Sequence, residues 1–138
     1  MFIKDADFIE IKVYWKKTKN KYESYTENEF NKLKIKEEFK SRFNLLNIKA
    51  CELYWELYNK MQEEAYEDAP DNTRRWSLKR YKENKLKKIV KDWDAKNEKG
   101  DKTPVSDGAI LHLAPVIAEA ILRAYDDATL LSEEDEKN

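Results

Sequence analysis

The sequence contains very few of the residues that bend or cross-link a chain. Its 138 residues include two glycines, three prolines, one cysteine and one histidine. A single cysteine excludes an intrachain disulfide, and two glycines cannot form the phosphate-holding loop of common nucleotide-binding proteins. Cys51 and His112 are too few and too far apart in the sequence to supply the four ligands of a zinc site. The composition therefore predicts a protein without a bound metal or cofactor.

Long apolar runs are also absent. No stretch approaches the ~20 apolar residues that a membrane-spanning helix needs, and the start, MFIKDADF, has acids where a signal peptide is apolar. We therefore expect a cytoplasmic protein that does not enter a membrane. Aromatic residues make up 12% of the chain, which excludes a disordered protein. The length predicts a single globular domain over residues 1–131, followed by an acidic, disordered tail at 132–138.

Charged residues are abundant, and the two signs are segregated along the chain. The net charge is −1, yet residues 74–91 contain nine basic residues and one acidic residue. Acidic segments lie on both sides of this basic segment, at 63–71 and 126–136. Such blocks either pair with one another inside the folded molecule or each face a partner. The sequence leaves both interpretations open.

The N-terminal part has the alternating pattern of β-strands. Residues 8–16 place Ile9, Ile11, Val13 and Trp15 on one side and charged residues on the other, which predicts a half-buried strand. A turn with a short return strand follows at 17–25, and residues 41–50 are also strand-like.

The segment between these strands has no single interpretation. Residues 26–40 fit either a helix or a strand. Thr26, three positions before Glu29, nevertheless forms the sequence pattern of a capping box.

The second half of the chain has helical periodicity. Apolar residues predict helices near 50–68 and 73–94, and the stripe of the second helix is expected to bury Trp76 and Trp93. After a polar loop, Ser106 or Asp107 caps a short helical turn, and Pro115 starts the last helix, near 115–130. The buried stripe of this last helix comprises Ile117, Ile121, Leu122 and Tyr125.

These elements together predict an α+β fold that is mainly α. A short N-terminal β element, at about 8–48, would pack on a bundle of three or four helices at about 50–131.

The residue types that usually carry catalysis are scattered. His112 lies in the apolar context ILHLAP, which is typical of a partly buried, hydrogen-bonded helix residue, and Cys51 is expected to be a buried, inert thiol. Acidic pairs lie at helix ends or in the tail, whereas glycosidases and metal-dependent nucleases need carboxylates that converge in a cleft. The pairs are Glu63/Glu64, Asp126/Asp127 and the group Glu133, Glu134 and Asp135. We predict that the protein is not an enzyme.

The basic segment is the strongest local signal. Its cations, with Trp76 and Tyr81 between them, could bind nucleic-acid phosphates. The net charge near zero argues against a dedicated DNA-binding protein, so we favour a protein contact or a structural role and keep nucleic-acid binding as the alternative. The candidate contact residues are Tyr54, Trp55, Tyr58, Arg74, Arg75, Lys79, Arg80 and Lys82.

Residues 50–128 also combine several features in a particular order. The helix ELYWELYNKMQEEA precedes a basic helix that ends in Trp93–Asp94, and a polar loop with glycine and proline leads to an Ala/Leu/Tyr-rich terminal helix. This order resembles the tail assembly chaperones of long-tailed bacteriophages. The resemblance implies a non-catalytic adaptor in the host cytoplasm that binds the tape-measure protein and recruits tail tube subunits. No set of family residues carries over position by position. A small phage-encoded inhibitor or host-interaction protein is a further alternative.

Overall fold

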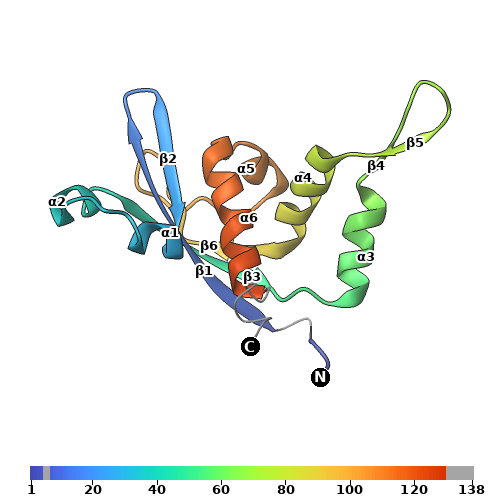
Figure 1. Cartoon of the computed structure of the whole chain (residues 1–138), viewed down its shortest axis with the longest axis horizontal. Helices are drawn as coiled ribbons and strands as arrows, with labels where there is room; N and C mark the ends of the chain where they lie inside the picture. The colour runs from blue at the N-terminus through green and yellow to red at the C-terminus, as the bar shows by residue number, and fades with distance from the viewer. Residues whose placement is uncertain (5–6, 130–138) are drawn as a thin grey trace.

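A four-stranded antiparallel sheet, in the order β2-β1-β3-β6, forms the centre of the molecule (Figure 1). The computed structural model describes residues 1–4 and 7–129, so the expected acidic tail lies outside the described residues. The strands of this sheet are β1 (Phe8–Thr18), β2 (Lys21–Thr26), β3 (Asn44–Cys51) and β6 (Val90–Trp93). A separate two-stranded hairpin pairs β4 (Tyr66–Asp68) with β5 (Arg74–Trp76). The helices are α1 (Glu27–Asn31), α2 (Glu37–Lys40), α3 (Trp55–Glu64), α4 (Leu78–Ile89), α5 (Asp107–Leu111) and α6 (Pro115–Thr129).

The expectation of a mainly helical fold is wrong. Helices hold 40% of the chain and strands 29%, so the fold is α+β with a sheet that is as central as the helices. The helix expected near 73–94 spans only Leu78–Ile89, and the helix expected near 50–68 spans only Trp55–Glu64. Most of the residues that were expected at the ends of these two helices form strands instead. β6 covers the open edge of β3, and β5 folds back on β4 after a turn in which Asn72 has a φ of 64°.

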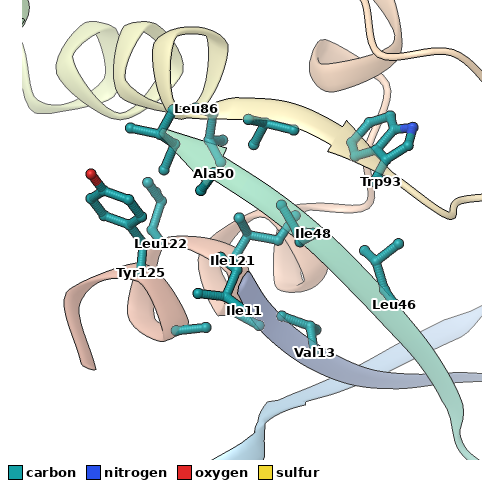
Figure 2. Close-up of a cluster of buried hydrophobic side chains, with 14 of the residues drawn as sticks. Ile11, Val13, Leu46, Ile48, Ala50, Leu86, Trp93, Ile121, Leu122 and Tyr125 are labelled. Carbon is teal, nitrogen blue, oxygen red and sulfur yellow. The ribbon is translucent and has the colours of Figure 1, made fainter. Parts of the chain in front are cut away.

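The strand predictions for the N-terminal half are confirmed. β1 includes the whole of 8–16, β2 is the return strand, and β3 forms from the strand-like stretch at 41–50. The register pairs Ile11 with Ile48 and Val13 with Leu46, which places these four apolar side chains on one face of the sheet. All four are buried (Figure 2). The alternation of the sequence therefore sets the register, because a slip by one residue would expose the whole row.

Helix α6 covers this apolar face. It starts at Pro115 and buries the predicted stripe, including Ile121 and Tyr125, so both predictions are confirmed. The Tyr125 hydroxyl donates a 2.9 Å hydrogen bond to the carbonyl oxygen of Cys51, at the end of β3. Burial raises the pKa of Tyr125 well above its usual range, so the hydroxyl stays protonated and keeps donating. This hydrogen bond fixes the position of α6 along β3, and the ring of Tyr125 fills part of the core.

The opposite face of the sheet has a smaller aromatic cluster. Tyr14 stacks on Phe30 with ring centroids 4.0 Å apart, and Phe43 meets Phe30 edge-on at 5.2 Å. Phe30 belongs to α1, so the ambiguous stretch at 26–40 folds as two short helices, α1 and α2.

One carboxylate ties α1 to α6. The capping box predicted from Thr26 and Glu29 is present, with the Glu29 side chain accepting from the Thr26 N–H. The Arg123 guanidinium of α6 donates to both oxygens of the same carboxylate at 3.0 Å. These Arg123 hydrogen bonds lower the pKa of Glu29.

The two tryptophans expected in one helical stripe lie in different environments. Trp93 is on β6, 4% exposed, and its indole N–H donates to the carbonyl oxygen of Thr103 at 2.6 Å. Trp76 is on β5 and 41% exposed, so the expectation that it is buried is wrong. The hairpin carries Trp76 away from the core, whereas pairing with β3 carries Trp93 into it.

The two tryptophans give a matched pair of substitutions. Trp93→Ala should lower the free energy of unfolding by about 3–5 kcal/mol, because it leaves a cavity and an unpaired carbonyl. Trp76→Ala should lower it by less than about 1 kcal/mol, because little buried area is lost. Chemical denaturation of both variants checks the difference. Equal losses would contradict the placement of β6.

The Glu29–Arg123 contact should make stability depend on acid. Because the folded-state pKa of Glu29 is lowered, the contribution of this contact is complete above the unfolded pKa and is lost as pH falls through the folded-state pKa. Arg123→Gln should therefore cost about 1 kcal/mol at pH 7 and much less at pH 3. Urea denaturation at both pH values measures this. The control is Lys12→Gln, which removes an exposed pair whose nitrogen and oxygen are 3.9 Å apart and should change little. A cost of Arg123→Gln that is the same at both pH values would rule out the ionic contribution.

Candidate functional site

The basic segment does not form one continuous helical face. Arg74 and Arg75 lie on β5, and the helix α4 begins only at Leu78. Lys79, Arg80 and Lys82 are on this helix, as expected. The eight candidate residues therefore divide among the hairpin, α4 and the start of α3.

One row of α4 side chains holds α3 in place. Arg80 donates to the main-chain carbonyl oxygen of Glu64 at 2.7 Å, and Asn84 donates to the same oxygen at 3.1 Å. One turn further on, the Lys88 ammonium lies 3.1 Å from the Glu64 carboxylate. The carbonyl groups at the end of a helix lack hydrogen-bond partners within it, and Arg80 and Asn84 supply donors to one of them at the end of α3. The interactions of Arg80 are therefore structural, although the sequence made it a candidate contact residue.

Another row of α4 side chains pairs with α6. The Lys82 ammonium lies 2.9 Å from Glu119, and the Lys85 ammonium lies 2.8 Å from Asp126. The Lys85 side chain is only 11% exposed, and its ammonium also lies over the ring of Tyr125, 5.5 Å from the centroid. The basic segment thus neutralises acids of the same molecule, which is one of the two interpretations that the sequence left open.

The β4–β5 hairpin presents an aromatic face. Tyr66 and Trp76 are direct cross-strand partners, so they share one face, and both are partly exposed. The Arg74 guanidinium lies over the Tyr66 ring at 5.2 Å and pairs with Glu63 at 3.2 Å. Arg75 is opposite Glu67, on the other face of the hairpin.

An apolar groove of about 450 Å³ lies between α4 and α6. Its apolar lining consists of Leu78, Leu86, Pro115, Ala118 and Leu122. Charged side chains of both signs also line it, namely Lys79, Lys82, Glu83 and Glu119. Leu78, at the mouth of the groove, is 55% exposed and lies two residues after the end of the hairpin. Val116 of α6 does not line the groove and is 44% exposed. The groove is therefore a mainly apolar concavity with a charged border.

The aromatic candidates on α3 lie apart from this groove. Trp55 is 77% exposed and stacks on Tyr58, with ring centroids 5.9 Å apart. Tyr54 precedes the helix and lines a different cleft, between α3 and the end of α4. The structure therefore does not bring Tyr54, Trp55 and Tyr58 together with Arg74 or Lys79.

The two residues considered for catalysis have ordinary environments. Cys51 is buried as expected, its thiol donates to the Lys88 carbonyl oxygen at 3.3 Å, and burial raises the pKa of the thiol. His112 donates a 2.7 Å hydrogen bond from Nδ1 to the Gly108 carbonyl oxygen. It is exposed at the end of α5, so the expectation of partial burial is wrong. Within residues 1–4 and 7–129, no three His, Cys, Asp or Glu side chains cluster closely enough to hold a metal ion.

No family model matches the chain, and no curated protein or solved structure is significantly similar to it. Among the described helices, none has the length and apolar character needed to cross a membrane.

Sequence reasoning missed the groove. Leu122 was predicted in the buried stripe of the last helix and is indeed buried, as is Leu86, but both also reach the groove between the two helices. No signal in the sequence gave the distance between α4 and α6. Ser77 could have been recognised as an N-cap, which would have placed Leu78 at the first position of α4.

The ion pairs between α4 and α6 should be unequal in their effect. Lys85→Ala should lower the free energy of unfolding by about 2 kcal/mol, because it removes a buried stem and leaves Asp126 without its partner. The matched control is Lys79→Ala on the same helix, which removes an exposed lysine and should change stability by less than about 0.5 kcal/mol. Thermal and urea unfolding of both variants measure this. Similar losses would contradict the buried position of Lys85.

Proposed function

We propose that the protein is a non-catalytic adaptor that binds another protein through the groove between α4 and α6. The observation that carries this proposal is the groove itself, an apolar concavity bordered by charges of both signs. An amphipathic helix of a partner is the occupant that fits such a surface, because it would place apolar residues against Leu86 and Leu122 and charged residues along the border.

The groove is supported on both sides by fixed elements. α6 packs on the sheet through its buried stripe, and α4 is joined to it by the Lys82–Glu119 and Lys85–Asp126 pairs. A partner would therefore meet a surface that is already ordered, which reduces the entropic cost of binding.

The hairpin face adds residues of the kind that dominate binding energies. Trp, Tyr and Arg are the residue types most enriched at interface hot spots. Trp76, Tyr66 and Arg74 share the hairpin face, and Trp76 is two residues from Leu78 at the mouth of the groove. We infer that the hairpin face extends the binding surface beyond the groove.

The resemblance to tail assembly chaperones suggests which partner to test first. It would make the tape-measure protein the occupant, with tail tube subunits recruited later, in the cytoplasm of a phage host. A phage-encoded inhibitor that binds a host protein would use the same surface. The neighbouring genes distinguish these two functions, since a tail assembly chaperone gene precedes the tape-measure gene.

The test uses Leu78→Glu, which places a charge at the mouth of the groove. Leu78 is exposed and begins α4, where a carboxylate is favourable, so the variant should fold normally. If a tape-measure gene lies immediately downstream, its product should co-purify with the wild-type protein after co-expression. Leu78→Glu should weaken this binding at least about tenfold, because burying an unpaired charge is costly.

The control is Leu45→Glu, at a leucine that is 42% exposed on β3 and outside the groove. It should bind the partner as the wild type does. Equal binding by Leu78→Glu and the wild type would overturn the groove as the binding surface. A genome with no tape-measure gene beside this one would overturn the assignment to tail assembly and leave the groove to be tested with another partner.

A further inference from the structure

A second concave site lies on the opposite side of α4 from the groove. It is a cleft of about 370 Å³ between the N-terminal segment, the end of β3, the start of α3 and the end of α4. Figure 1 shows the N-terminus near the lower end of α3. Five lysines line the cleft, namely Lys4, Lys60, Lys87, Lys88 and Lys91, and we call it the lysine cleft.

The lysine cleft has a large excess of positive charge. Glu52 is the one acidic residue among its lining residues. Lys88 pairs with Glu64 at 3.1 Å, and Lys60 has an exposed contact with Glu56 at 3.7 Å. Within residues 1–4 and 7–129, no ion pair joins Lys4, Lys87 or Lys91 to an acid. Like charges in one concavity repel each other, so an anion that enters is attracted by all of them together.

The convergence of these lysines comes from the fold. Lys4, Lys60 and the group at 87–91 are distant in the sequence, and the packing of α3 against α4 brings them to one cleft. Most other cations of the basic segment are paired with acids of the same molecule, as with Lys82 and Lys85. At the end of α4, cations without an acid partner among the described residues converge on one cleft, and this convergence distinguishes them from Lys79 at its start.

The chemistry of the cleft favours phosphate over carboxylate. A phosphate group carries more negative charge and more acceptor oxygens than a carboxylate, and lysine binds it as a flexible point charge. All five cations of the cleft are lysines, and its volume lies in the range of small-ligand sites. Tyr54 and Leu57 add an apolar wall beside the ammonium groups.

We propose that the lysine cleft binds a ligand with two or more linked phosphate groups. The source is either a free phosphate chain, as in a nucleotide, or the backbone of a single-stranded nucleic acid. The site shares no lining residue with the groove between α4 and α6, so this proposal stands or falls independently of the adaptor function.

The test measures binding of two probes, inorganic tripolyphosphate and a short labelled oligothymidylate, to the full chain. Both should bind at about 50 mM salt, and oligothymidylate binding should weaken steeply towards about 200 mM. The triple variant Lys60→Gln, Lys87→Gln and Lys91→Gln should bind each probe at least about tenfold more weakly, and its salt slope should fall by about 2. Tighter binding of oligothymidylate than of tripolyphosphate assigns the nucleic-acid source, and the reverse assigns the free phosphate chain.

The control has the same change in charge at another place. Lys32→Gln, Lys34→Gln and Lys36→Gln together remove three exposed lysines around α1 and α2, outside the cleft. This variant should bind as the wild type does. The single variant Lys60→Glu, at a lysine whose side chain is 59% exposed, repeats the test if the triple variant is unstable.

Three results would overturn the proposal. One is the absence of binding at about 50 mM salt, and another is equal weakening by the two triple variants, which would indicate non-specific attraction. The third concerns the chain's own acids at 133–136. If only a full chain with these acids changed to amides binds the probes, the cleft is occupied by that segment and not by phosphate.

Discussion

The antiparallel pairing of β1 with β3 is the constraint on which the other elements depend. It joins a strand from the start of the chain to one that leads directly into the helical half, and it places Ile11, Val13, Leu46 and Ile48 on one face. That face needs a cover, and α6 provides it with Ile121 and Tyr125. α4 then packs beside α6, so the groove exists because the sheet requires α6 where it is. The lysine cleft has the same origin, since it opens where β3 ends and α3 begins.

Much of this could be predicted from local sequence, because the signals are local. The alternation at 8–16 predicts β1, the Thr26–Glu29 pattern predicts the cap of α1, and Pro115 predicts the start of α6. These predictions require only a residue's near neighbours. The buried stripe of α6 was also found, because a strongly apolar helical face has few alternatives to the core.

The failures concern residues whose structure depends on distant partners. Val90 and Trp93 continue the helical spacing of α4, yet they form a strand because β3 has an open edge beside them. Trp76 continues the same spacing, yet a turn at Asn72 pairs it with Tyr66. The candidate contact residues divide among several elements for a similar reason. Sequence showed a block of cations, but only the fold decides which of them meet an acid and which converge on a cleft.

The way α3 and α4 are joined has an evolutionary consequence. The Ser77 N–H donates to the Ala65 carbonyl oxygen at 2.9 Å, so the hairpin that stands between them is closed at its base. Arg80 and Asn84 hold the end of α3 without using any residue of the hairpin. Residues 66–76 contact the two helices through exposed side chains, as in the Arg74–Glu63 pair and the Trp76–Tyr81 contact, so their length and sequence can diverge while the two helices keep their places. Related chains could exchange this hairpin at little cost to the rest of the fold.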